Sequence, residues 1–398
     1  MFENVDAYPG DPILGLNEEF HRDLRAEKVN LSIGIYFDAD GNLPLMSAVR
    51  DAERSLLERS SPRPYLPISG NLDYRQRIQE LVFGVEHPAR KDGRIVTLQT
   101  LGGSGALKVG ADFLKLCFPK SSVWVSDPTW DNHQMVFERA GLGVHAYPYY
   151  DSESGGLRFD DMCATIRSLP PRSGVLLHAC CHNPTGVDLT PAQWEALTPI
   201  LLERDLIAFV DRAYQGFGGG LDEDAAAVQA LAAAGVCCVV ANSLSKNFSM
   251  YGERCGGLSI VCESEHEAQR VLTQLMATVR SNYSNPPTHG AQVAANILGS
   301  PVLRMKWETE LASMRERIAT MRRAIHSALK DHVEERRLSR YLTHRGMFTY
   351  TGLDAAQVDQ LRSEYGVYLL RSGRMCIAGL NESNLPVVVR AFAGVLTL

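Results

Sequence analysis

The sequence has little that would place the protein in a membrane or on a nucleic acid. No apolar run approaches the ~18 to 20 residues of a membrane-spanning helix. The first ten residues contain acids and a proline where a secretory signal carries a basic and then an apolar stretch. The formal net charge is -6, so there is no general basic excess for binding nucleic acid. We therefore expect a cytoplasmic protein whose partners are small molecules.

The sequence also lacks a Cys-x-x-Cys pair, the commonest element of zinc and thiol-redox motifs. Its nine cysteines include two adjacent pairs, Cys180-Cys181 and Cys237-Cys238, on strand-like segments. Adjacent residues of a strand point to opposite faces, so neither pair is well placed to form a bridge. We expect reduced, mostly buried cysteines that act as small apolar residues, and no metal site.

What the sequence does have is enough length for two domains, since 398 residues exceed the roughly 250 to 300 at which one core stops growing. From residue 94 onward, strand and helix patterns alternate, which predicts an α/β fold with a mostly parallel sheet and helices on both faces. The predicted strands are 94–100, 123–126, 143–147, 174–180, 207–211, 235–241 and 257–262. The predicted helices are 16–26, 45–59, 106–117, 133–140, 159–168, 191–203, 265–280 and 301–329. A further strand, 29–36, contains Gly34, and glycine inside a strand often marks close backbone approach.

A single lysine, Lys246, follows the apolar stretch 235–241, which is typical of a buried strand. Ligands bind at the carboxyl ends of strands in open α/β sheets. Burial and the nearby charge of Arg254 disfavour the ammonium form of such a lysine, so its neutral amine can attack a carbonyl carbon. Lys246 is our candidate Schiff-base lysine, and the alternative is a solvated loop lysine.

Residues 101–105, Leu-Gly-Gly-Ser-Gly, lie between a predicted strand and a predicted helix. Glycines let backbone N–H groups approach an anion, and the helix dipole favours negative charge there. The segment is a candidate phosphate site, although a plain tight turn uses the same residues. It has neither the Gly-x-Gly-x-x-Gly spacing of dinucleotide sites nor the lysine of a P-loop, which disfavours both of those functions.

Three other strand ends carry polar or aromatic residues. Asp211 ends the strand 207–211, with Tyr214 three residues later, and a carboxylate buried there needs a cationic partner. Asn183 lies in the turn 182–186, and Trp130 ends the turn 126–130. Asp211 could instead be a helix cap, and Trp130 a core residue.

Together these features match the needs of one ligand, pyridoxal 5'-phosphate. The sequence resembles, from end to end, the class I aminotransferases of the aspartate and aromatic amino acid subgroup, which are fold-type-I pyridoxal-phosphate enzymes. The motifs that carry the resemblance are Ser-x-Ser-Lys at 243–246, Arg-x-Gly-Gly at 254–257, Asn-Pro-Thr-Gly at 183–186 and Asp-x-Ala-Tyr at 211–214.

The resemblance implies a role for each residue around the cofactor ring. Lys246 would attach the cofactor and transfer the proton in catalysis. Asp211 would pair with the pyridinium nitrogen and keep the ring an electron sink. Asn183 and Tyr214 would bond the phenolic oxygen, and Trp130 would stack on the ring.

Around these lie further residues whose roles the resemblance also implies. The phosphate would be held by Gly103, Ser104, Ser243 and Arg254, joined by Tyr65 from the partner subunit of a homodimer. His133 and His178 resemble the histidines that lie behind the aspartate, and either could instead be an ordinary core histidine.

For the substrate, Arg374 resembles the arginine that binds the α-carboxylate through a bidentate fork. Gly34 would contact the same group through its backbone, and Trp130 and Asn183 would also contact the substrate. Arg280 would reach across the dimer to the distal carboxylate of aspartate or glutamate.

One departure from the family pattern is Arg212, where relatives usually carry an apolar residue. Alternation along the strand predicts that it points away from the cofactor. Nothing in the sequence explains its use.

The expected preference among amino acid substrates rests on the residues that form the wall of the substrate pocket. The positions that resemble it are apolar: Ile35, Phe37, Leu43 and Pro64, with Ser104 beside them at the phosphate site. At roughly 25 cal/mol per Å² of apolar area, enclosing an aromatic ring offsets much of the ~1.5 to 3 kcal/mol that a distal carboxylate gains from an arginine. We therefore expect an aromatic-amino-acid aminotransferase that acts on phenylalanine and tyrosine with 2-oxoglutarate, and that also accepts aspartate and glutamate.

Three alternatives remain open. The first is an aspartate aminotransferase with little aromatic activity. The second, a pyridoxal-phosphate decarboxylase or β-lyase, fits less well because Arg280 and Arg374 suit exchange between dicarboxylic substrates. The third, a non-catalytic binder, is disfavoured by the complete lysine, aspartate and tyrosine set. By resemblance, a large cofactor-binding domain spans residues 44–314, and residues 1–43 and 315–398 form a small domain.

Overall fold

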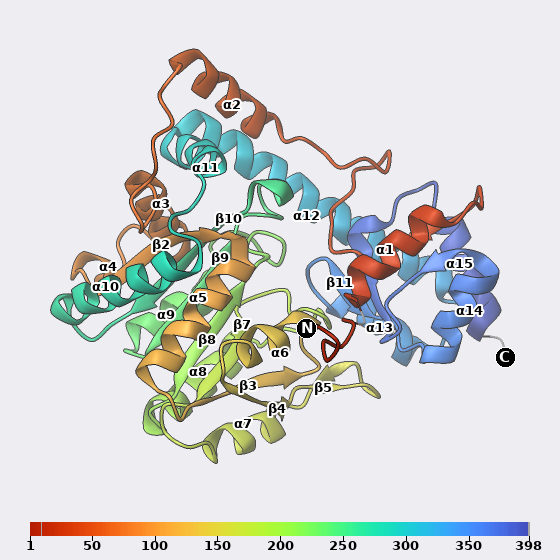
Figure 1. Ribbon diagram of the computed structural model, residues 1–398. Coiled ribbons are helices and arrows are strands. Elements are labelled where there is room, and N and C mark those ends of the chain that lie inside the picture. Colours follow the sequence, from red (N-terminus) through yellow and green to blue (C-terminus); the bar gives the residue numbers. More distant parts are fainter. Residues whose placement is uncertain (9, 397–398) are drawn as a thin grey trace.

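A seven-stranded sheet forms the centre of the molecule in the computed structural model, which describes residues 1–8 and 10–396 (Figure 1). In spatial order its strands are β2 (Ile95–Leu101), β10 (Cys255–Val261), β9 (Cys238–Ser243), β8 (Ile207–Arg212), β7 (Gly174–His178), β3 (Ser122–Asp127) and β4 (Gly143–Pro148). Neighbouring strands are parallel except where β10 pairs with β2 and β9. The predicted mostly parallel α/β sheet is confirmed.

Helices cover both faces of this sheet and form a hydrophobic core on each. Because side chains alternate along a strand, Phe209 points into one core, and Ala208 and Val210 point into the other. The first core is completed by α5 (Gly102–Cys117), α6 (Asp131–Glu138) and α10 (Glu265–Asn282). The second includes α3 (Leu72–Phe83), α7 (Phe159–Arg167), α8 (Pro191–Glu203) and α9 (Ala226–Ala233). Both faces are therefore buried, which explains the continuous apolar runs in the strands.

A second lobe combines segments from the two ends of the chain, seen as red and blue ribbons side by side in Figure 1. Its helices are α1 (Pro12–Arg22), α13 (Glu335–Thr343), α14 (Ala355–Tyr365) and α15 (Leu385–Leu396). Its short strand pairs are β1 (Val29–Asn30) with β12 (Val367–Tyr368) and β11 (Phe348–Tyr350) with β13 (Arg374–Cys376). Leu16 of α1 packs against Tyr368 and Leu370, which ties the N-terminal helix to the C-terminal segment.

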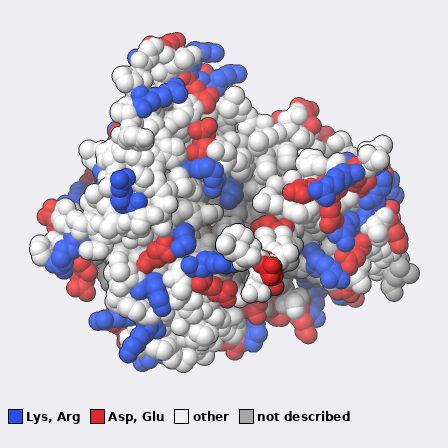
Figure 2. Space-filling model, in the orientation of Figure 1, with Lys and Arg blue, Asp and Glu red and all other residues white. Residues whose placement is uncertain are grey.

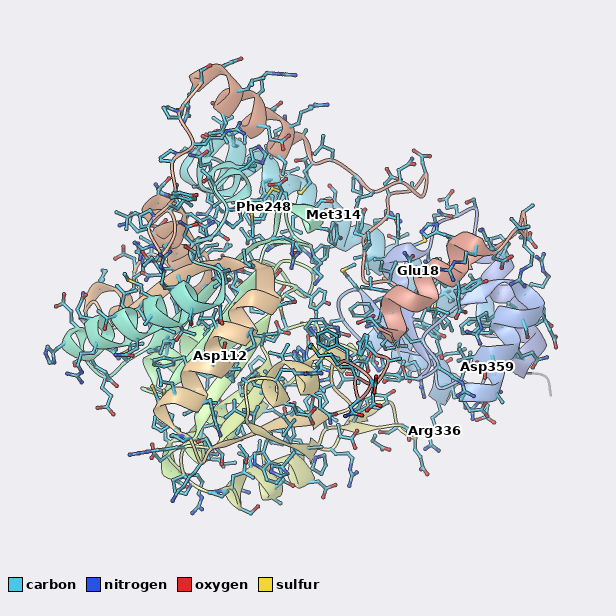
Figure 3. All side chains as sticks on the ribbon, in the orientation of Figure 1. Glu18, Asp112, Phe248, Met314, Arg336 and Asp359 are labelled. Carbon is cyan, nitrogen blue, oxygen red and sulfur yellow. The ribbon has the colours of Figure 1, made fainter. Side chains whose placement is uncertain are left out.

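The lobes are joined by α12 (Pro301–Leu329), which packs against α2 (Ser47–Arg59) and α11 (His289–Gly299) at one end. Met314, labelled in Figure 3, lies within this helix, so the expected domain boundary at 314 falls inside a continuous element. The remaining elements are short: α4 (Pro88–Lys91), β5 (Tyr150–Asp151), β6 (Gly156–Leu157), and the 3₁₀ turns η1 (Tyr251–Glu253) and η2 (Ile377–Gly379). Within the described residues, no helix combines the length and apolar character required to cross a membrane.

Several element boundaries differ from those predicted. The strand expected over 29–36 is only β1, because Leu31 bonds to two separate segments, donating to Tyr368 and accepting from Cys376, rather than continuing one ladder. The helix expected over 16–26 begins earlier, at Pro12, because the side chain of Asp11 caps the N–H groups of Ile13 and Leu14. Helices α3, α4, α9 and α11 were not predicted, and no bounds were predicted for α13, α14 and α15.

Two boundaries next to the candidate site also moved. Helix α5 begins at Gly102, so the glycine-rich segment is its first turn rather than a loop before it. Strand β7 ends at His178, two residues earlier than expected, which leaves Cys180 and Cys181 outside the strand.

Candidate active site

A cavity of about 390 Å³ lies between the two lobes, at the carboxyl ends of the parallel strands. Figure 2 shows this face of the molecule hollowed between the lobes. The cavity is lined by most of the predicted residues: Gly34, Gly103, Ser104, Trp130, Asn183, Asp211, Tyr214, Ser243, Lys246, Arg254 and Arg374. Residues from distant parts of the sequence thus converge at the edge of the sheet where ligands bind.

Lys246 lies three residues beyond the end of β9 and is largely buried in the cavity wall. Its Nζ is 4.9 Å from the centroid of the Tyr214 ring. Burial lowers the pKa of Lys246 to about 8; the charge of Asp211 opposes this shift, and the charges of Arg254 and Arg374 add to it. At pH 7 about a tenth of this lysine is therefore a neutral, nucleophilic amine, compared with less than about a thousandth for a lysine of ordinary pKa.

Asp211 is held by two histidines. The parallel register of β7 and β8 sets His178 beside Asp211, and their Nε2 and Oδ2 atoms are 3.9 Å apart. His133, from α6, donates from Nε2 to the same oxygen at 3.0 Å, and its Nδ1 is 2.8 Å from the Thr129 hydroxyl. Burial by itself would raise the pKa of Asp211, but the hydrogen bond and charge of His133, with His178 and Lys246, bring it below its ordinary value. Burial lowers the pKa of His178 to about 3, so that histidine is neutral.

Asn183, Tyr214 and Arg374 form a connected polar group on another wall. Asn183 Nδ2 donates to Tyr214 Oη at 3.4 Å, and Arg374 Nη1 donates to Asn183 Oδ1 at 3.2 Å. Arg374 also donates to the Ser32 carbonyl at 2.6 Å, yet its buried Nε has no partner among the described residues. No carboxylate of the described chain forms an ion pair with Arg374. Its unused donors and uncompensated charge suit a carboxylate from a ligand.

The backbone at Gly34 lies close to another segment, as the glycine within the predicted strand suggested. A Cβ atom at this position would lie 2.9 Å from Cζ of Phe348, whose ring is also covered by the guanidinium of Arg374 at 4.4 Å. Any side chain at Gly34 would therefore displace the ring that supports Arg374.

The far end of the cavity combines a helix N-terminus with a cation. Gly102, with φ of +66°, starts α5, and a Cβ there would lie 2.4 Å from Arg254 Nη2. Arg254 donates to Ser245 Oγ at 3.3 Å and to the Tyr251 carbonyl at 2.8 Å, and the Ser243 hydroxyl is 3.2 Å from that of Ser245. First-turn N–H groups lack intrahelical acceptors. Free amides, hydroxyls and a guanidinium together fit a phosphate.

Two predicted residues lie outside this cavity in their own chain. Tyr65 is 92% exposed on the irregular segment 60–71 that precedes α3, and Arg280 is exposed in the last turn of α10, where it donates to Ser284 Oγ. Neither lines the cavity with Lys246. If they act on a ligand there, it is the ligand of another subunit.

The residues predicted for the apolar wall do not form it in the cavity of a single chain. None of Ile35, Phe37, Leu43 and Pro64 lines the cavity, and Leu43 and Pro64 are exposed. The apolar lining comes instead from Ile13, Leu14, Ile33, Leu107 and Phe348. The first two belong to α1, which was predicted to begin only at residue 16. The Asp11-Pro12 cap was the available signal that α1 starts early enough to reach it.

Arg212 points away from the cavity, as predicted. It is fully buried on the opposite face of β8, donating to Asn242 Oδ1 at 3.5 Å and to the Leu81 carbonyl at 3.4 Å. Burial lowers its pKa to about 10. It therefore remains a buried cation near neutral pH.

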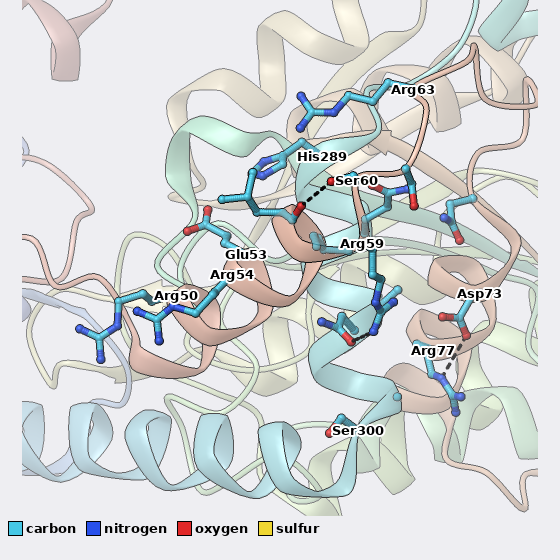
Figure 4. Close-up of a pocket in the computed structure, with 18 residues that line it drawn as sticks. Arg50, Glu53, Arg54, Arg59, Ser60, Arg63, Asp73, Arg77, His289 and Ser300 are labelled. Atoms are coloured by element: carbon cyan, nitrogen blue, oxygen red, sulfur yellow. Dashed lines mark hydrogen bonds and ion pairs between the residues drawn. The ribbon is translucent and has the colours of Figure 1, made fainter.

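A larger cavity, of about 830 Å³, lies elsewhere, between α2, α3 and α11 (Figure 4). Its charged lining is mostly basic, with Arg50, Arg54, Arg59, Arg63, Arg77 and His289 against Glu53 and Asp73. It contains none of the predicted site residues. Its size alone therefore does not make it a site for the chemistry described above.

Residues 26–392 match the family described as aminotransferase class I and II. The chain belongs to this family. Among similar proteins, the aromatic-amino-acid aminotransferase of Escherichia coli (strain K12) is 55% identical, and an aspartate aminotransferase of Pseudomonas aeruginosa is 49% identical, each over 100% of both chains. The crystal structure of an aromatic-amino-acid aminotransferase from Burkholderia pseudomallei, covalently bound to pyridoxal phosphate, is 51% identical, with a TM-score of 0.97 over 100% of this chain and 99% of the other.

The predicted resemblance to class I aminotransferases is thus confirmed. The cavity of this aminotransferase also passes a chemical test for the expected cofactor. It contains an amine with a lowered pKa, a buried carboxylate and, at its far end, a candidate anion site. The amine can react with the aldehyde of the cofactor, the carboxylate can pair with its ring nitrogen, and the anion site can bind its phosphate.

Proposed function

We propose that this chain is a pyridoxal-phosphate-dependent aminotransferase of aromatic L-amino acids, with 2-oxoglutarate as amino acceptor and with aspartate and glutamate also accepted. The observation that carries the proposal is the convergence of Lys246, Asp211, Arg254 and Arg374 in one cavity of about 390 Å³. The cofactor needs the first three of these groups: an amine, a carboxylate and a phosphate site. The amino acid substrate needs the fourth, an arginine that binds its carboxylate.

The cofactor, when bound, supplies an aldehyde carbon for amines and an electron-withdrawing ring. Lys246 holds it covalently, and Asp211 provides the negative charge that keeps the ring nitrogen protonated. Asn183 and Tyr214 donate to the phenolic oxygen, and Trp130 covers the ring. The phosphate is held by Gly103, Ser104, Ser243 and Arg254, with Tyr65 of a second copy of the chain.

The protein's own groups then handle the substrate's charge and proton. Arg374 binds the α-carboxylate and thereby orients the Cα–H bond toward Lys246. Lys246, once free, accepts that proton at Nζ and returns it to another atom, which its lowered pKa favours near neutral pH. His133 fixes Asp211 from behind by the 3.0 Å hydrogen bond.

Support for the aromatic preference comes from the apolar lining, Ile13, Leu14, Ile33, Leu107 and Phe348. Burying a phenyl ring against such a wall is favourable at roughly 25 cal/mol per Å². The 55% identity to an enzyme named for aromatic amino acids points the same way. The second candidate is an aspartate aminotransferase, which the 49% identical relative favours.

The proposal includes a homodimer with shared sites, since Tyr65 and Arg280 are exposed and lie outside the cavity of their own chain. Leu57 and Leu72, 74% and 59% exposed, flank Tyr65 in sequence and add apolar surface for a partner. The proposal also keeps the expected domains, 44–314 and 1–43 with 315–398, and a cytoplasmic location.

The test is kcat/KM for phenylalanine, tyrosine and aspartate with 2-oxoglutarate, in the wild type and in Arg280→Ala. We expect comparable aromatic and aspartate values in the wild type. Arg280→Ala should lower the aspartate value by about 10- to 150-fold, because a charged hydrogen bond of ~1.5 to 3 kcal/mol is lost, and leave phenylalanine nearly unchanged. Aromatic values hundreds of times below aspartate would leave the second candidate in place.

A further inference from the structure

The two adjacent cysteine pairs differ in geometry, contrary to expectation. Cys237 is exposed just before β9 begins, and Cys238 is buried as the first residue of that strand. Cys180 and Cys181 instead follow the end of β7, and Cys181 has a left-handed φ of +52°. This bend turns both thiols to one side, where their Sγ atoms and a carboxylate oxygen of Asp224 all lie within 4.8 Å of one another.

This cluster can be reached from solvent. A cavity of about 720 Å³, separate from the catalytic one, is lined by both Cys180 and Asp224. Its outer wall is formed by the exposed residues Pro191, Glu195 and Pro199 of α8. A small ion can therefore approach Cys180 without passing through the active site.

Asp224 retains capacity for one more partner. Its Oδ2 accepts from the N–H groups of Gly216 and Gly218 at 2.7 and 2.9 Å, and its Oδ1 accepts from Gly219 at 2.9 Å. A carboxylate offers about four acceptor positions, so one is left on Oδ1. The three hydrogen bonds hold the carboxylate in place, as a preorganised ligand requires.

The charges around the cluster also balance. The buried cation Arg212 is close enough to Cys180 and Asp224 to interact with both electrostatically, and it has no ion pair among the described residues. The partly buried carboxylate of Asp188 and the buried cation of Arg322 also interact with the cluster, so two carboxylates and two cations offset one another. A divalent cation that replaces two thiol protons adds no net charge to this buried group, which avoids the cost of burying an extra charge.

We propose that Cys180, Cys181 and Asp224 form a binding site for a thiophilic divalent cation of the Zn²⁺ or Cd²⁺ class. Both thiols lose a proton to solvent as the two metal–sulfur bonds form, Asp224 supplies an oxygen, and a water from the cavity completes four-coordination. Tetrahedral coordination at metal–sulfur distances of ~2.3 Å sets the sulfur atoms roughly 3.8 Å apart, so the cluster contracts by about 1 Å at most.

Contraction of this site is transmitted to the catalytic cavity. Cys181 directly precedes His182 and Asn183, and its Sγ is 4.0 Å from the carbonyl of Tyr214. Asp224 holds the segment that follows Tyr214. Metal binding therefore shifts Asn183 and Tyr214, and lowers turnover without competing with the amino acid.

Titration of the purified holoenzyme with Cd²⁺ tests the site, read by the ultraviolet charge-transfer band of thiolate bound to cadmium. We expect one Cd²⁺ per chain, release of two protons, and a fall of about fivefold or more in turnover that a chelator reverses. Cys180→Ala should reduce the band at saturating Cd²⁺ to about half and weaken binding about tenfold or more, because one of two thiolates is lost. Cys237→Ala, in the other adjacent pair, should change neither.

Thermal melting followed by circular dichroism shows whether each variant folds, and Cys180→Ser replaces Cys180→Ala if it does not. Absence of the band in wild type, an undiminished band with unchanged affinity in the Cys180 variant, or loss of the band in Cys237→Ala would each overturn the proposal. The band and the proton count do not depend on turnover, so they remain informative even if the proposed reaction is wrong.

Discussion

The two ends of the catalytic cavity differ in how many of their predicted residues come from a single chain. At the cofactor end, Lys246, Asp211 and Arg254 all face the cavity of their own chain. Tyr65, the further residue proposed to hold the phosphate, is exposed outside that cavity. At the substrate end, Arg374 is in place, but Arg280 is exposed outside the cavity of its own chain. If the proposed dimer forms, one subunit supplies the reacting groups, and its partner adds one phosphate contact and the group that recognises the distal end of the substrate.

The largest effect is expected at the cofactor end, from Lys246→Ala. Loss of the nucleophile and proton carrier should lower turnover by about 10⁴-fold. Borohydride should no longer fix the cofactor to the protein, as peptide mass analysis can show. Lys115→Ala, on the surface of α5, serves as the control and should behave like wild type. An unchanged spectrum with cofactor still fixed in Lys246→Ala would contradict the assignment.

Next in size is Asp211→Asn, which keeps the shape of the side chain and removes its charge. Turnover should fall by about 10²- to 10³-fold while some cofactor is retained, because the ring nitrogen loses its preorganised counter-charge. Asp211→Ala should lose at least as much. Wild-type rates in either variant would mean that the carboxylate has only a structural role. Turnover and cofactor content are measured on the same samples.

A mixing experiment addresses the comparison between the two ends directly. Inactive Lys246→Ala subunits are combined with inactive subunits that carry Tyr65→Ala and Arg280→Ala, and aspartate transamination is followed. Random exchange should restore about a quarter of the wild-type activity, since half of the dimers are mixed and each holds one intact site. Exchange demonstrated by mass spectrometry without any recovery would rule out a shared site.

The smallest effect concerns the pH at which Lys246 loses its proton. Attachment of the cofactor to protein stripped of it should speed up as the pH rises and level off above about 8, because burial lowers the pKa of Lys246 to that value. The charge of Asp211 raises this pKa, so Asp211→Asn should move the midpoint to lower pH. Stopped-flow absorbance from pH 6 to 10 measures both. A midpoint near the ~10.4 of an ordinary lysine would mean that Lys246 is solvated.

The order of the seven main strands from residue 94 to 262, every α-helix between them except α9, and most residues of the cofactor end followed from local patterns. A continuous β-branched run such as that before Lys246 fits a strand buried on both faces, and its end is a ligand site in any parallel sheet. The motifs at 183–186, 211–214 and 243–257 then indicated the family, and the family indicated a role for each of these positions.

Other features depend on contacts between segments that are far apart in the sequence. The apolar wall was assigned to residues near 35, 43 and 64, but it is formed in part by Ile13 and Leu14, because α1 starts at Pro12 and packs against the C-terminal segment. The sequence also showed no sign that the strand would stop at residue 30. Leu31, which follows it, bonds to two separate segments of the second lobe.

The sequence by itself determined the family, the α/β class and which residues carry the chemistry, since short motifs and side-chain periodicity are local properties. Only the tertiary structure decided which side chains share a cavity. It set His178 beside Asp211 through the register of β7 and β8, left Tyr65 and Arg280 outside, and brought Cys180, Cys181 and Asp224 within 4.8 Å. The position of the cysteines, for example, depends on the end of β7 at His178 and on the left-handed backbone of Cys181. Contacts between distant segments fix both features.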